Sequence, residues 1–199
     1  MSLKIRKLND CVIFPNEQGS ISPFMKKLTC RIRKAKVEDA HAIVTAEQEI
    51  AATPGYFCSQ PNELNELNVI KTIKSLAESE KGIYLVAERD GKIVGHAFLE
   101  PLHLKSICHV AQLSIGVHHG WQENGIGTAL MEELIAWAKQ STTIEKIELN
   151  VRASNSRAIA LYKKMGFVEE GRLKNRIKVS ANHYIDDVLM ALNVKITSL

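Results

Sequence analysis

The chain has 199 residues, of which 45% are hydrophobic and 24% charged, as expected for one globular domain with a substantial core. Its formal net charge is +4, but residues 1–27 hold five Lys and Arg against two acidic residues, so the remainder is close to neutral. The basic excess therefore gives little support for nucleic acid binding, and no apolar stretch approaches the roughly 20 residues that cross a membrane. We expect neither a nucleic acid nor a membrane partner.

Residues 1–27 show little hydrophobic periodicity and contain Pro and Gly as breakers, and residues 1–15 lack the apolar core of a secretory signal. They are predicted to form a peripheral extension to a single domain of residues 28–199. The four cysteines include no Cys-x-x-Cys pair, and we expect them to be reduced thiols of a cytoplasmic protein.

The first part of this domain is predicted to contain one strand and two helices. Residues 30–34 alternate in strand fashion, and helical periodicity follows over residues 37–50 and 68–77. The connection between the two helices, residues 53–62, is rich in Pro, Gly and Asn, and it is a candidate wall of a substrate groove.

A hairpin is predicted next. Residues 83–88 and 92–100 are two apolar runs, and the dipeptide Asp90-Gly91 joins them. Asp-Gly between such runs is a strong signal for a tight turn, so the two strands should be antiparallel neighbours.

The second half of the domain contains a parallel crossover and a final hairpin. A strand over residues 110–117, a helix and a strand over residues 146–151 predict a right-handed crossover with parallel pairing. Residues 167–170, 172–179 and 184–192 then favour a terminal antiparallel hairpin. The resulting fold class is α/β, with a mixed, mostly antiparallel central sheet that is flanked by helices.

A glycine-containing loop leads from the strand of residues 110–117 into the helix that opens near Thr128. Glycine allows tight turns and close approach of a ligand, and the first turn of a helix offers unpaired N–H groups at the positive end of its dipole. We therefore predict a pyrophosphate cradle. Its sequence is Gln122-Glu123-Asn124-Gly125-Ile126-Gly127.

A second motif begins 30 residues after Gly125, in the last predicted helix. Tyr162 follows Asn155 by seven residues, which is about two helical turns, so both side chains project from similar faces of that helix. The motif residues are Asn155, Ala158, Leu161, Tyr162, Gly166 and Phe167.

Together the two motifs resemble those of the GNAT superfamily of acetyl-CoA-dependent N-acetyltransferases, over roughly residues 28–192. The resemblance implies the GNAT fold and acetyl-CoA as co-substrate, with the loop amides from Gln122 to Thr128 on the pyrophosphate and Asn155 and Ala158 beside the pantetheine arm. It also implies a strand end that splays from its parallel neighbour and binds the same arm. The residues that match this strand end are Ser114, Ile115, Gly116 and Val117.

The resemblance further implies that Tyr162 is the general acid that protonates the coenzyme A thiolate. The alternative is a core tyrosine whose hydroxyl bonds to the backbone. The general base stays open, because Gln112 occupies the place where many relatives have a Glu, and an amide cannot take a proton at neutral pH. Three possibilities are open: Glu100 acts through water, His109 acts through water, or the amine arrives already neutral.

The acceptor is expected to be the amine of a small molecule or a peptide. The carboxyl-terminal segment resembles that of bacterial enzymes similar to phosphinothricin acetyltransferases, which acetylate small amines. We expect no metal, since His118 and His119 point in opposite directions on a strand and have no spaced Cys or carboxylate. A homodimer formed through the terminal hairpin is plausible.

Basic residues at spacing two, Arg172, Lys174, Arg176 and Lys178, are predicted to form one strip on a strand. Such a strip is either a solvated face or a surface that attracts an acidic substrate or partner.

Two functions of other classes remain as alternatives. A non-catalytic acetyl-CoA-binding regulatory module would keep the cradle without a base. A dinucleotide-binding oxidoreductase would use Gly125 and Gly127 with Glu148 as the ribose-binding acid, although Leu130 stands where its third glycine belongs.

Overall fold

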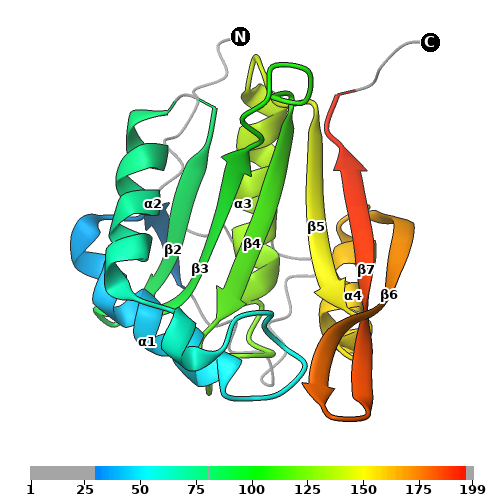
Figure 1. Ribbon diagram of the computed structural model, residues 1–199. Helices are drawn as coiled ribbons and strands as arrows, with labels where there is room; N and C mark the ends of the chain where they lie inside the picture. The colour runs from blue at the N-terminus through cyan, green and yellow to red at the C-terminus, as the bar shows by residue number, and fades with distance from the viewer. Residues whose placement is uncertain (1–29, 80, 196–199) are drawn as a thin grey trace, which may run out of the picture.

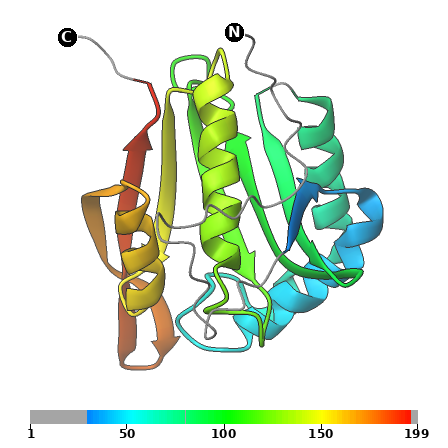
Figure 2. The same cartoon turned by 180° about the vertical axis from the view of Figure 1, so that it is seen from behind.

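The computed structural model describes residues 30–79 and 81–195, and the predicted extension over residues 1–27 lies outside them. A seven-stranded mixed sheet with the order β1-β2-β3-β4-β5-β7-β6 forms the centre, and helices cover both of its faces (Figures 1 and 2). No helix in the described part of the chain is long and apolar enough to cross a membrane.

The strands are β1 (Arg31–Lys34), β2 (Ile83–Arg89), β3 (Lys92–Pro101), β4 (Val110–Val117), β5 (Lys146–Arg152), β6 (Val168–Ser180) and β7 (His183–Asn193). The helices are η1 (Val37–Asp39), α1 (Ala40–Ala51), η2 (Pro61–Glu63), α2 (Glu66–Glu78), α3 (Ile126–Gln140) and α4 (Ser156–Lys164).

The predicted fold class is confirmed in its main features. The β2–β3 hairpin turns at Asp90 and Gly91, which have φ values of 50° and 72°, as a tight hairpin turn requires. All neighbouring strands are antiparallel except β4 and β5, which are the parallel pair of the predicted crossover.

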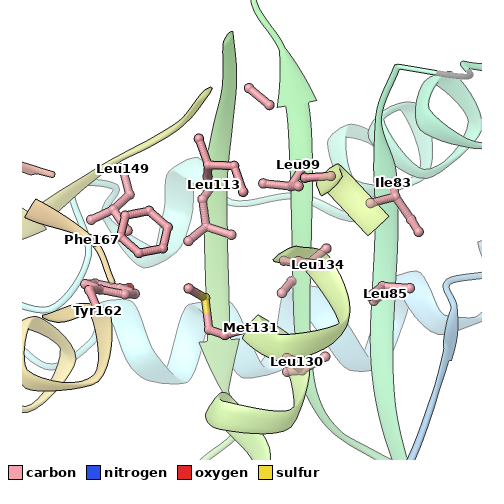
Figure 3. Close-up of a cluster of buried hydrophobic side chains, with 14 of the residues drawn as sticks. Ile83, Leu85, Leu99, Leu113, Leu130, Met131, Leu134, Leu149, Tyr162 and Phe167 are labelled. Atoms are coloured by element: carbon pink, nitrogen blue, oxygen red, sulfur yellow. The ribbon is translucent and has the colours of Figure 1, made fainter. Parts of the chain in front are cut away.

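Strand alternation divides the apolar residues between the two faces of the sheet. Helices α3 and α4 lie on one face, while α1 and α2 lie on the other (Figures 1 and 2). The fully buried Leu130, Met131 and Leu134 of α3 pack against apolar residues of the strands, among them Leu99 and Leu113 (Figure 3). Each such side chain contributes about 1.5–3 kcal/mol by leaving water, so α3 is fixed firmly against the sheet.

The parallel pairing of β4 with β5 is short. It joins Val110 to Lys146 and ends where Gln112 lies opposite Glu148. Beyond that point β4 continues to Val117, paired only with β3. The two strands therefore diverge toward their carboxyl ends (Figure 1), and the backbone of residues 113–117 has no strand partner on the side of β5.

A chain of buried polar side chains lies on the opposite face of β3 and β4 from α3. Nδ1 of the fully buried His96 is 3.1 Å from Nε2 of His118, which is also buried. Nε2 of His96 lies 3.3 Å from Oε1 of the buried Glu47 in α1, in an orientation that makes no hydrogen bond. A Cβ on Gly116 would lie 2.8 Å from the His96 ring. Only glycine therefore fits at this position of β4.

The β6–β7 hairpin departs from regular pairing. Its register shifts between Leu173 and Ile177, and Asn175 adopts a φ of 53°. The basic side chains of β6 therefore do not form one continuous strip. Arg172 lies 3.9 Å from Asp186 as an ion pair, whereas Arg176 has no ion-pair partner within residues 30–79 and 81–195.

The pH dependence of stability tests the buried His118. Burial, followed by the neighbouring His96, lowers the pKa of His118 from 6.5 to about 4. The unfolded chain binds a proton that the folded protein rejects, so the free energy of unfolding should fall by up to about 1.4 kcal/mol per pH unit between these two values as the pH decreases. Chemical denaturation at several pH values should show that His118→Gln removes this part of the slope. The matched variant His119→Gln, at an exposed site, should keep it, and equal slopes in both variants would contradict the assignment.

Candidate active site

A cavity of about 550 Å³ opens where β4 and β5 diverge. Residues of both strands line it, together with the loop before α3, helix α4 and the segment that follows α1. Its volume lies within the range of about 300–1,000 Å³ that is usual for small-molecule sites. The short parallel pairing thus creates a pocket in the middle of the sheet.

The loop between β4 and α3 presents backbone amides to this cavity. Gly125 is the N-cap of α3 with a φ of 78°, and Ala129 is the first residue whose N–H bonds within the helix, to the Gly125 carbonyl at 3.0 Å. The N–H groups of Ile126, Gly127 and Thr128 therefore have no intrahelical partner and lie at the positive end of a 15-residue helix. This geometry suits an anion, as the sequence predicts.

Side chains hold the loop in shape. Nε2 of Gln122 donates to the carbonyl of Val117 at 3.2 Å, and Nδ2 of Asn124 donates to the carbonyl of Gln122 at 3.0 Å. Glu123 adopts a φ of 66° and lies 3.4 Å from Arg157 of α4 as an exposed ion pair. The loop is thus tied both to the end of β4 and to the first turn of α4.

The predicted cofactor-binding residues line the cavity, with two exceptions. Gly116 and Asn124 do not, because Gly116 packs against His96 and Asn124 supports the loop. The residues that do line it are Ser114, Ile115, Val117, Gln122, Glu123, Gly125, Ile126, Gly127, Thr128, Asn155, Ala158 and Tyr162.

Asn155 has a structural role in addition to its place at the cavity. It is the N-cap of α4, and its Oδ1 accepts a hydrogen bond from the N–H of Ala158 at 3.1 Å. Such a cap typically contributes about 1 kcal/mol to a helix. The helix that presents Tyr162 to the cavity is thus capped by a residue of the same motif.

Tyr162 is buried, with 8% of its surface exposed, and its ring centroid lies 5.9 Å from that of Phe167 (Figure 3). Its hydroxyl has no hydrogen-bond partner among the residues that the structure describes. Burial raises the pKa of Tyr162 to about 12, so the phenol stays protonated at neutral pH. The tyrosine therefore presents an unused O–H donor at the cavity, which differs from a core tyrosine that bonds to the backbone.

The candidate bases lie less favourably. Glu100 is directly opposite Gln112 in the β3–β4 ladder and half-buried, but it does not line the cavity. His109 precedes β4 at the end remote from the loop, where its carbonyl accepts from the N–H of Glu145 at 2.8 Å. Within the described ranges, no group of three His, Cys, Asp or Glu residues could hold a metal ion.

Other lining residues were missed by sequence reasoning or predicted only as a segment. Tyr56, Phe57, Cys58 and Ser59 line the cavity, which confirms part of the predicted wall over residues 53–62. The fold brings the other lining residues to the cavity from separate elements. A charged residue at the end of a predicted strand is the only sequence signal that could have pointed to any of them. They include Trp121, Asn150, Arg152 and Arg157.

Comparisons with known proteins support the geometry. The model of the acetyltransferase (GNAT) family matches residues 45–167. The L-amino acid N-acetyltransferase AaaT of Escherichia coli is 32% identical over 163 residues, which cover 80% of this chain and 95% of that protein. The [ribosomal protein bS18]-alanine N-acetyltransferase of Escherichia coli is 27% identical over 59% of this chain and 75% of its own length.

Solved structures agree in fold. A GNAT-family acetyltransferase from Streptococcus pneumoniae superposes with a TM-score of 0.75 and 28% identity, covering 81% of this chain and 98% of that chain. The putative acetyltransferase yncA from Salmonella typhimurium, solved with its cofactor acetyl-CoA, has a TM-score of 0.77 at 19% identity, covering 85% of this chain and 96% of that chain.

Two glycines with the same backbone conformation allow the anion cradle to be tested. Gly125 and Gly120 both have a φ of 78° and open space around an added Cβ, but only Gly125 lines the cavity. Alanine at either position should cost about 1–2 kcal/mol of stability, measured by thermal unfolding. Only Gly125→Ala should also weaken acetyl-CoA binding, by about tenfold or more in calorimetry. The reason is that strain at the N-cap would change the orientation of the N–H groups that have no intrahelical partner. Unchanged affinity in Gly125→Ala would contradict the cradle.

Proposed function

This chain belongs to the acetyltransferase (GNAT) family, and on that basis we propose that it moves the acetyl group of acetyl-CoA to a primary amine by direct attack in a ternary complex. The observation that carries this proposal is the buried Tyr162, whose hydroxyl is unpartnered among the described residues and lies at a cavity between two diverging strands. The donor would place its pyrophosphate on the amides of Ile126, Gly127 and Thr128. Its pantetheine arm would lie along the edge of residues 113–117 that has no strand partner on the side of β5.

The reaction requires two proton movements. The neutral amine nitrogen attacks the thioester carbon, a C–N bond forms, and the C–S bond breaks with its electron pair going to sulfur. Tyr162 then supplies a proton to the thiolate, and its raised pKa of about 12 keeps it ready as a donor at neutral pH. The nitrogen loses one proton to a base or to solvent, and Tyr162 regains its proton from solvent, which returns the enzyme to its starting state.

We propose Glu100 as that base, acting through water. Its carboxylate projects from β3 on the same side of the sheet as the paired Gln112 and as Ser114, which lines the cavity two residues further along β4. Because Glu100 itself does not line the cavity, a proton can reach it only along intervening water. An amine that arrives neutral reduces this requirement.

The names of the relatives indicate a broad class of acceptor. One is named for L-amino acids and another for the alanine of a ribosomal protein, so a small-molecule or peptide amine fits both. We further propose that the enzyme acts in the cytoplasm, in line with Cys58 and Cys108, which are free thiols within the described part of the chain. We also propose that two copies of the chain form a homodimer through the β6–β7 hairpin.

The alternatives from other classes receive less support. The relatives are named as N-acetyltransferases, which favours catalysis over a regulatory module. A dinucleotide-binding fold needs a mostly parallel sheet, whereas here only β4 and β5 are parallel among the described strands.

Replacement of Tyr162 by Phe tests the acid. Tyr162→Phe removes only the hydroxyl, so kcat should fall by about 10²- to 10⁴-fold in a thiol-release assay with an amine panel. The dissociation constant of acetyl-CoA should change less than about threefold, since the ring still packs against Phe167. Tyr184→Phe, on an exposed residue of β7, is the control and should retain full activity. An unchanged kcat in Tyr162→Phe would remove the tyrosine from the chemistry.

Glu100→Gln tests the base through its pH profile. At neutral pH, kcat/KM should drop by about tenfold or more, and the defect should shrink as the pH approaches the pKa of the acceptor amine, which then loses its proton unaided. Glu132→Gln, at an exposed position of α3, should behave like the wild type at every pH. A constant ratio of mutant to wild-type activity across the range would argue against Glu100.

A further inference from the structure

A buried arginine lies in the wall of the cavity and has no place in the acetyl-transfer chemistry. Arg152 ends β5, has 8% of its surface exposed and lines the cavity. Its Nη1 donates to Oδ1 of Asp187, which lies opposite it in β7 and is also buried. Its Nε has no hydrogen-bond partner. A guanidinium has five N–H donors, and the ion pair with Asp187 uses few of them.

Strand alternation places Arg152 on the side of the sheet away from α3 and α4. Leu149 and Val151 of β5 belong to the core that α3 covers, so Asn150 and Arg152 project from the opposite face. The segment after α1 closes over this face, because Oγ of Ser154 donates to the carbonyl of Gly55 at 3.2 Å. The guanidinium therefore lies apart from the anion-binding amides of the loop before α3.

A second cavity of about 460 Å³ adjoins the first on this side. Phe57, Cys58 and Ser59 line both cavities. The charged residues that line the second one are Arg176 and Lys178 of β6, and no acidic residue is among its described lining. Beyond the Glu123–Arg157 pair at the loop, the charged side chains around the two cavities are thus all cationic.

We infer that the acceptor is an amine that also bears a carboxylate, and that Arg152 binds this carboxylate. The inference rests on the proposed acetyl transfer and names the substrate class of the same site. Asp187 holds the guanidinium in a fixed orientation, and a carboxylate would satisfy donors that the protein leaves unused. Arg176 and Lys178 extend the positive potential outward, where a longer acidic acceptor would lie.

Both charges of the buried pair are needed for this arrangement. Loss of Arg152 alone leaves Asp187 buried without a partner, which can cost enough stability to unfold the chain. The double variant Arg152→Gln/Asp187→Asn removes both charges and keeps similar shapes. It therefore separates carboxylate recognition from folding, and its thermal unfolding should be cooperative like that of the wild type.

The test compares leucine with leucinamide as acceptors. The amide has the less basic α-amine, so more of it is neutral and reactive at a given pH, and amine chemistry alone favours it. Carboxylate recognition predicts the reverse: wild-type kcat/KM should be about 10- to 100-fold higher for leucine. The double variant should lose this preference and keep its acetyl-CoA affinity. A preference for leucine that the double variant retains would overturn the inference.

A second arm identifies the source of the carboxylate. A peptide amide with an acidic second residue is compared with its Gln counterpart, in the wild type and in Arg176→Gln/Lys178→Gln. Preference for the acidic peptide that this variant loses assigns the carboxylate to a peptide, whereas preference for leucine alone assigns it to free amino acids. Arg172→Gln/Lys174→Gln, on the same strand outside the cavity, should retain every preference. If the wild type discriminates in neither arm, the inference fails.

Calorimetry keeps this inference separate from the proposed function. Titration of leucine and leucinamide into coenzyme A-saturated protein measures carboxylate binding without turnover. If no amine is acetylated but leucine still binds through Arg152, the proposed function is wrong and the carboxylate site stands. If amines are acetylated, but leucine binds no tighter than leucinamide and the acidic peptide is not preferred, the carboxylate site is wrong and the proposed function stands.

Discussion

Pairing between β4 and β5 stops after three residue pairs, the last being Gln112 with Glu148, and the rest of the site depends on this early end. A parallel ladder that continued to Val117 would close the sheet and leave no cavity. The strands can part because each keeps a full antiparallel partner on its outer side, β3 for β4 and β7 for β5. The sheet thus opens in its middle, while each of these two strands stays paired along its outer edge.

The two sides of this opening have different chemistry. On the side of α3 and α4, apolar packing fixes the helix whose first amides face the cavity, and it also buries Tyr162. On the other side, the strands project polar residues such as Asn150 and Arg152, under the segment that follows α1. One side is therefore suited to a phosphate-bearing donor, and the other to a polar acceptor whose reacting atom meets the donor between the strands.

Local signals predicted much of this arrangement. Asp90-Gly91 identified the hairpin, and the glycine-containing loop predicted a helix that opens near Thr128, where α3 begins at Ile126. Both signals depend on turn conformations that neighbouring residues determine. Contacts between distant segments left no such signal. The pair of Arg152 with Asp187 depends on the β5–β7 register, and the packing of His96 against Gly116 depends on the β3–β4 register. The general base could not be predicted from the sequence either, because a proton path depends on where residues lie in three dimensions.

A crystal structure of the protein with acetyl-CoA tests this arrangement most directly. We expect the thioester to lie between β4 and β5, with the Tyr162 hydroxyl within hydrogen-bonding distance of the sulfur and the pyrophosphate on the amides of residues 126–128. A thioester placed elsewhere, or a Tyr162 hydroxyl that bonds to the protein and not to the sulfur, would contradict it.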